Sequence, residues 1–88
     1  MTKIHYFISA SGDNPVKKFI DSSESQTKKK IFKIFVFIEK YGIQAVFKHT
    51  KKLTGTPLWE IRILGKSSTR IIYATIYKTD ILLLNSFL

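Results

Sequence analysis

The side chains best suited to acid–base chemistry and to anion binding gather in one stretch without periodicity, residues 43–57. His49 is the candidate general base, because histidine titrates near neutral pH and can accept a proton from a reacting group. Lys48, Lys51 and Lys52 could hold the backbone of a polyanion through charge alone, without reading its sequence. A solvated basic loop with an inert histidine is the alternative. The sequence therefore predicts a basic connector here.

Two strand patterns in the second half of the chain define another candidate surface. Leu58–Leu64 and Arg70–Tyr77 both alternate apolar and polar residues, as half-buried strands do. A one-residue slip would mix buried and solvated sides, so we expect the two apolar sides to match. The expected pairs are Trp59, Ile61 and Ile63 with Ile76, Ala74 and Ile72.

The polar sides of these strands should share the opposite face of the hairpin. The residues expected there are Glu60, Arg62, Tyr73 and Thr75, with Tyr77 farther along. Helix packing does not need this face, so it is where we expect chemistry. Arg70 stands at the hairpin end, where the pattern leaves the direction of its side chain open.

The elements upstream supply the scaffold. Lys3–Ser9 alternates as a strand, and Asn14 and Pro15 predict a helix start as N-cap and first helical residue. A second helix is predicted from Gln26 to Tyr41, with Gly42 as its stop. Its core stripe has the i, i+3, i+4, i+7 spacing and consists of Ile31, Ile34, Phe35 and Ile38.

A last strand, Ile81–Phe87, completes the predicted order, after a hairpin loop at Gly65–Thr69 and a turn at Lys78–Asp80. The result is an α+β fold of order β-α-α-β-β-β, a twisted antiparallel sheet with a two-helix layer on one face. The 88 residues leave room for a single domain, residues 1–88.

Positive charge dominates the chain. Fifteen Lys and Arg against six Asp and Glu give a net charge of +9, whose field attracts polyanions or an acidic protein. A simpler explanation of this charge is that it keeps the protein soluble. Lysines crowd the first half of the second helix and oppose its dipole, so they form either a solvated face or a ridge that contacts phosphates or a partner. They are Lys28, Lys29, Lys30 and Lys33.

Several classes of protein are excluded by composition. The chain has no Cys, and His5 and His49 make a poor metal set, so we expect a reducing compartment and neither metal nor cofactor. The apolar stretch Ile4–Ile8 is too short for a secretory signal. No apolar run approaches the ~18 residues that span a bilayer. We expect a cytoplasmic protein without a membrane partner.

Three segments in the right order carry a resemblance that covers nearly the whole chain. They are Asn14–Asp21 (NPVKKFID), Lys51–Arg62 (KKLTGTPLWEIR) and Thr69–Tyr73 (TRIIY). The first belongs to the helix pair, and the second follows the helix pair and begins within the basic connector. This order resembles the HigB-like, phage-derived branch of the RelE/ParE toxins. The expected fold class, a RelE-like one, follows from this more than from periodicity.

The resemblance implies a toxin of a type II, two-gene toxin–antitoxin system that cleaves messenger RNA in the ribosomal A site without a metal. Its partners would be the ribosome, messenger RNA and a cognate antitoxin, a small helix-turn-helix protein. Arg62 and Arg70 match positions where the family places cations near the scissile phosphate, and the planar arginine fork suits phosphate oxygens. A solvated strand arginine and a hairpin salt bridge are the alternatives. His49 and Tyr73 would be further catalytic groups, although a strand aromatic is more often core or a stacking surface.

Departures from the family pattern leave activity in question. Relatives usually follow the last strand with a His-Gly-Phe-like step and a Lys-rich segment, whereas this chain reads Asn85-Ser86-Phe87-Leu88. Glu60 also stands where RelE itself carries a lysine. Two alternatives to an active endoribonuclease follow: an impaired toxin that only binds antitoxin or RNA, and a ParE-like gyrase inhibitor. A neighbouring gene for a helix-turn-helix protein would favour a toxin.

Overall fold

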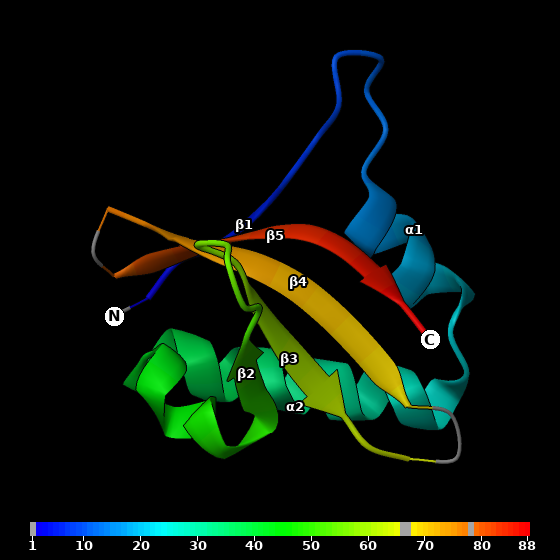
Figure 1. Ribbon diagram of the computed structural model, residues 1–88. Helices are drawn as coiled ribbons and strands as arrows, with labels where there is room; N and C mark the ends of the chain where they lie inside the picture. Colours follow the sequence, from blue (N-terminus) through cyan, green and yellow to red (C-terminus); the bar gives the residue numbers. More distant parts are fainter. Residues whose placement is uncertain (1, 66–67, 78) are drawn as a thin grey trace.

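The computed structural model describes residues 2–65, 68–77 and 79–88, which form five strands and three helices (Figure 1). In chain order they are β1 (Ile4–Tyr6), α1 (Pro15–Ser22), α2 (Ser25–Tyr41), the 3-10 helix η1 (Ile43–His49), β2 (Thr50–Lys52), β3 (Trp59–Ile63), β4 (Thr69–Ile76) and β5 (Asp80–Phe87). The α+β class is as predicted. The basic connector, however, holds two elements that periodicity missed, η1 and the short strand β2.

The five strands form one mixed sheet in the order β1-β5-β4-β3-β2. Neighbouring strands are antiparallel except β1, which lies at the edge and pairs in parallel with β5. The expectation of a wholly antiparallel sheet is therefore wrong. Three helices and three strands separate β1 from β5 in sequence, and such a long connection allows a parallel pairing that alternation alone cannot reveal.

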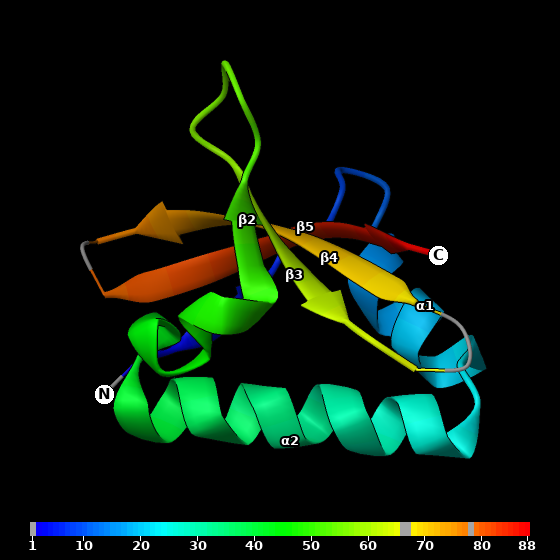
Figure 2. The same cartoon turned by 60° about the horizontal axis from the view of Figure 1, so that its bottom comes forward.

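Local signals set the bounds of the helices. The Asn14 side chain accepts a hydrogen bond from the Lys17 backbone N–H at 3.1 Å, and Pro15 opens α1. Gly42 ends α2 at φ +88°, a left-handed conformation that favours glycine. The start of α1 and the end of α2 both agree with the prediction. Figure 2 shows α2 running along one side of the sheet, with the β2–β3 loop projecting away from it.

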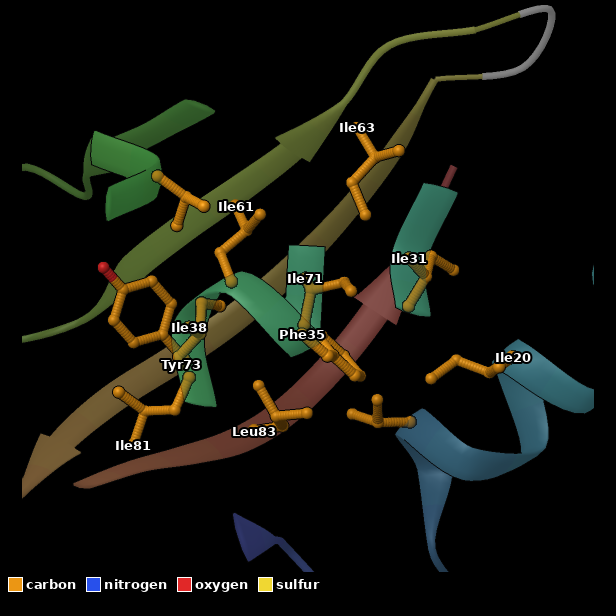
Figure 3. Close-up of a cluster of buried hydrophobic side chains, with 12 residues drawn as sticks. Ile20, Ile31, Phe35, Ile38, Ile61, Ile63, Ile71, Tyr73, Ile81 and Leu83 are labelled. Carbon is orange, nitrogen blue, oxygen red and sulfur yellow. The ribbon is translucent and has the colours of Figure 1, made fainter. Parts of the chain in front are cut away.

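The core lies between that side of the sheet and the helices (Figure 3). The helices contribute a buried apolar set that includes Val16, Ile20, Ile31, Phe35 and Ile38, and η1 adds Val46. The strands contribute Ile61, Ile63, Ile71, Tyr73, Ile81 and Leu83. Both α1 and α2 therefore cover the same face of the sheet, as predicted.

The predicted register of the β3–β4 hairpin is wrong by three residues, an odd number that exchanges the two faces of β4. Trp59, Ile61 and Ile63 lie opposite Tyr73, Ile71 and Thr69, not opposite Ile76, Ala74 and Ile72. Both sides of β4 are apolar, so alternation does not distinguish them. The observed register buries the side chains of Ile71 and Tyr73. It also stacks the Tyr73 ring on Trp59, with centroids 6.5 Å apart.

This register defines an open face of the sheet, on the side away from α2. Side chains alternate along each strand, so the open face receives Glu60 and Arg62 from β3 and Arg70, Ile72 and Ala74 from β4. Arg70, whose direction the sequence left open, points there. Thr75 was expected on this face and lies on the other. The hairpin loop and the last turn include residues 66–67 and 78, which lie outside the described residues.

Candidate functional site

Two arginines lie directly opposite each other on the open face. Arg62 on β3 and Arg70 on β4 are cross-strand partners, and both side chains are exposed. Like charges at directly opposed positions destabilise a sheet, because their Cβ atoms are about 5 Å apart. Such a pair is favourable only with a counter-charge or with an anionic ligand between the two guanidinium groups.

Part of that counter-charge comes from within β3. Glu60 is 4% exposed, and its Oε2 accepts a hydrogen bond from Arg62 Nε at 2.6 Å. Because this contact uses Nε, it leaves the two terminal amino groups of Arg62 for another acceptor. Glu60 thus orients Arg62 while offsetting one of the two arginine charges.

The connector lysines divide between the two faces of the sheet. Lys51 lies opposite Glu60 in the β2–β3 pair, so it joins Arg62 and Arg70 on the open face. Lys52 lies opposite Trp59, on the other face. Both are exposed. Lys51 and Lys52 of the connector therefore lie on opposite faces of the sheet.

A stack of aromatic rings fixes η1, and with it Lys48 and His49. The Phe47 ring lies nearly parallel to that of Trp59, with centroids 6.1 Å apart, and Val46 is buried in the core. The Thr50 hydroxyl donates to the Phe47 carbonyl at 2.9 Å and closes the end of η1. Lys48 and His49 follow this anchor immediately, so they are held beside β3 and α2.

Lys48, His49 and Arg62 line one cavity of about 390 Å³ between α2, η1 and β3. It lies where β2 has ended, because β2 pairs only with residues 59–61 of β3. Lys30 and Lys33 of α2 also line it. The cavity therefore joins the predicted general base to one of the predicted arginines, whereas Arg70 is not among its lining residues.

The predicted position of Tyr73 beside Arg62 is wrong. Tyr73 is 1% exposed and lies on the helix side of the sheet, stacked on Trp59. Burial raises the pKa of its hydroxyl to about 12, so the group stays protonated at neutral pH. In this structure Tyr73 supports the Trp59 ring that holds η1.

Three site residues were not predicted as such. Glu60 was noted as polar, but its hydrogen bond with Arg62 was not foreseen; two side chains at i and i+2 of a strand share a face, which was the available signal. Lys30 and Lys33 were assigned to a general lysine ridge. Lys30 Nζ donates to the Leu64 carbonyl at 3.0 Å, which joins α2 to the end of β3.

Among the described residues, no helix has the length and apolar character needed to cross a membrane. A comparison with curated proteins returned no match. The sequence model of the family described as phage derived protein Gp49-like (DUF891) matches residues 18–88, from within α1 to the end of β5 and including every residue of the site above. The chain therefore belongs to the phage-derived Gp49-like family, a family of the RelE/ParE-like toxin group.

Proposed function

We propose that this protein is the toxin of a two-gene toxin–antitoxin system and that it cleaves messenger RNA on the ribosome. Membership of a phage-derived, toxin-like family supports the first part. The observation that carries the second is the arginine pair on the open face, Arg62 opposite Arg70, with Glu60 orienting one of them.

In the proposed reaction, the 2′-hydroxyl oxygen of one nucleotide attacks the adjacent phosphorus and the bond from phosphorus to the 5′-oxygen breaks. The products are a 2′,3′-cyclic phosphate and a 5′-hydroxyl. Negative charge develops on the phosphate oxygens in the transition state. Arg62 and Arg70 stabilise it, because two planar donors on one face can bind two oxygens of the same group.

The remaining groups move a proton and hold the chain. His49 accepts the proton of the attacking hydroxyl, and its place in the cavity lined by Arg62 supports this role. The lysines contact the RNA backbone without reading its sequence. They are Lys48, Lys51 and Lys52. Tyr73 contributes no exposed proton donor here, since its side chain is buried.

A second candidate is a binding module of the same family without catalysis. It is favoured by the burial of Tyr73 and by Asn85, which lies on the open face opposite Ile72, where the resemblance to HigB-like toxins implies a histidine. Asparagine cannot shuttle a proton at neutral pH. This candidate keeps the antitoxin partner and the RNA contacts and predicts no cleavage.

The experiment is induction of the chain in bacterial cells, with mapping of new messenger RNA ends. The proposal expects new ends within translated regions and growth arrest, both lost on Arg70→Ala. The control is Lys40→Ala, which also removes one exposed cation but on α2, away from the open face. Growth arrest without new ends, together with gyrase inhibition in vitro, would point to a gyrase poison. Neither arrest nor new ends would favour the binding module.

A further inference from the structure

The flank of α2 that borders α1 and β1 carries a line of four exposed side chains, which we call the α2 stripe. Its members follow one another at intervals of three, four and three residues, the spacing of a seam between two packed helices. They are Lys29, Phe32, Val36 and Glu39. The stripe is therefore apolar in the middle and carries opposite charges at its two ends.

Two apolar hollows adjoin the middle of the stripe. Cavities of about 310 and 230 Å³ lie on either side of Phe32, which lines both of them together with Tyr6. Ile20 of α1 lines the first, and Ile4 of β1 and Val36 line the second. The Phe32 ring, 50% exposed, thus stands between two hollows that a side chain of another helix can enter.

Neither end of the stripe is neutralised within the described part of the chain. The ion pairs found there join other residues. Along α2, no oppositely charged residue stands three or four positions from Lys29 or from Glu39, where an intrahelical partner would have to lie. Both charges are therefore available to a second molecule.

We propose that two copies of this chain associate through the α2 stripe, with their α2 helices antiparallel about a two-fold axis. In this arrangement Phe32 packs against Val36 of the other copy, and Lys29 lies against Glu39 of the other copy. Each of these pairs is symmetric about the position of Ile34, so one placement of the helices makes all the contacts, each of them twice. The stripe is thus complementary to itself.

The balance of charge at the stripe is what permits association of a chain that carries +9. Two-fold symmetry sets each lysine of the stripe opposite a carboxylate. The adjoining hollows add Lys17 and Asp21, which already form an ion pair at 2.9 Å. The exposed lysines elsewhere on α2 line other cavities; they include Lys30, Lys33 and Lys40. Most of the excess positive charge therefore lies away from this contact.

Association through the α2 stripe leaves the candidate site uncovered. Arg62 and Arg70 belong to the open face, on the other side of the sheet. The cavity that His49 lines borders the opposite flank of α2, through Lys33 and Phe37. A dimer would present two open faces at once. The inference goes beyond the proposed function, because dimerisation and cleavage are measured separately and neither requires the other.

The first test is sedimentation velocity of the purified full chain, from low micromolar concentration to the solubility limit. We expect a monomer–dimer equilibrium that Phe32→Ser weakens at least about tenfold, because the partner no longer buries a ring. The matched control is Phe37→Ser, which removes a similarly exposed ring, 43% against 50%, from the other flank and should leave the equilibrium unchanged. A chain that stays monomeric, or equal losses in both variants, would overturn the proposal.

Charge reversal tests the antiparallel pairing. Lys29→Glu sets glutamates opposite each other and Glu39→Lys sets lysines opposite each other, so each should weaken the dimer roughly fivefold to tenfold. The double variant Lys29→Glu/Glu39→Lys restores both pairs and should regain the original affinity. Lys52→Glu, on β2 at the far edge of the sheet, changes net charge alone and should not weaken the dimer.

The pattern among these variants distinguishes the possible arrangements. In a parallel pair the unmodified chain already sets like charges against each other, so neither single reversal would weaken it, and that result would overturn the antiparallel proposal. A double variant that folds by circular dichroism and stays as weak as the single variants would overturn it as well.

Mixing the two single variants supplies the last test. When a Lys29→Glu chain meets a Glu39→Lys chain, both end contacts join opposite charges, so the mixed dimer should form more tightly than either variant alone. The measurement is sedimentation of one dye-labelled variant with the other added unlabelled. A mixture that associates no better than its components would show that these residues do not face each other, and would overturn the proposal.

Discussion

Replacing Glu60 by glutamine tests how the open face holds its charge. The Glu60 carboxylate is buried and accepts the Arg62 Nε–H at 2.6 Å, while Arg70 lies directly across from Arg62. Glutamine keeps the shape and an acceptor oxygen but removes the negative charge. The positive charge of Arg62 is then no longer offset by a carboxylate, so the open face gains one effective cation that can bind phosphate.

The size of the effect follows from counterion release. One further phosphate contact steepens the dependence of log K on log salt by roughly 0.7 for single strands. Over a tenfold rise in salt, binding should therefore weaken by an additional factor of about five compared with the unmodified chain. The free energy of unfolding should fall by about 1–2 kcal/mol, because one charge-assisted hydrogen bond becomes a neutral one.

The assay is anisotropy of a labelled single-stranded RNA at several salt concentrations, for the unmodified chain and Glu60→Gln. Thermal or denaturant unfolding of both proteins supplies the stability. We expect tighter RNA binding at low salt and a steeper salt slope. An unchanged slope, or weaker binding at low salt, would refute the reasoning that Arg62 and Glu60 form the charge-balanced part of an RNA site.

Three further predictions concern the register, the edge strand and the open face. Ile71→Ala should destabilise the fold by about 2–5 kcal/mol and Ile72→Ala by less than half as much in urea unfolding, because Ile71 is fully buried and Ile72 lies on the open face; the reverse order would contradict the register. Hydrogen bonds from His5 and the Lys3 backbone hold the pKa of Asp80 below its usual value, so ionised Asp80 stabilises the fold near neutral pH and this contribution is lost as the pH falls. Asp80→Asn should therefore unfold more easily than the unmodified chain at pH 7, and the difference should close below the usual aspartate pKa of about 3.9; a gap that persists in acid would argue against stabilisation by hydrogen bonds to the ionised carboxylate. Asn85→His should raise RNA cleavage at least about tenfold with a pH dependence typical of histidine, measured on ribosome-bound messenger; an unchanged rate would show that Asn85 does not lie near the reacting groups.

The helical half of the fold could be predicted from local signals. Asn14 and Pro15 mark the start of α1, Gly42 ends α2, and the apolar stripe of α2 faces the core as expected. Each of these features depends on residues within one or two turns of the chain. Local sequence therefore suffices for them.

The sheet could be predicted only in part, because its pairing depends on residues far apart in the sequence. β4 is apolar on both sides, so alternation could not choose between Ile71 and Ile72 as the core residue. The direction of β1 and the three-residue strand β2 likewise follow from tertiary packing. The same error moved Tyr73 into the candidate site.

Only part of the candidate site could be predicted from the sequence. Arg62 and His49 could be named from residue type and resemblance, and the structure adds that they line one cavity. Glu60 as the partner of Arg62 could have been inferred from their i, i+2 spacing on one strand, whereas placing Lys30 and Lys33 at the cavity required the contact between α2 and the end of β3. Contacts between distant elements leave no periodic signal in a single sequence.

The measurement that tests the central claim most directly uses reconstituted ribosomes carrying a defined messenger RNA, with analysis of the product ends. The account predicts a 2′,3′-cyclic phosphate and a 5′-hydroxyl, produced by the unmodified chain and by Lys40→Ala but lost with Arg70→Ala. A single 2′-deoxy nucleotide at the cleavage position should block the reaction, because the attacking oxygen is then missing. Cleavage that survives the deoxy substitution, or that Arg70→Ala leaves unchanged, would contradict the assignment of this reaction to the open face.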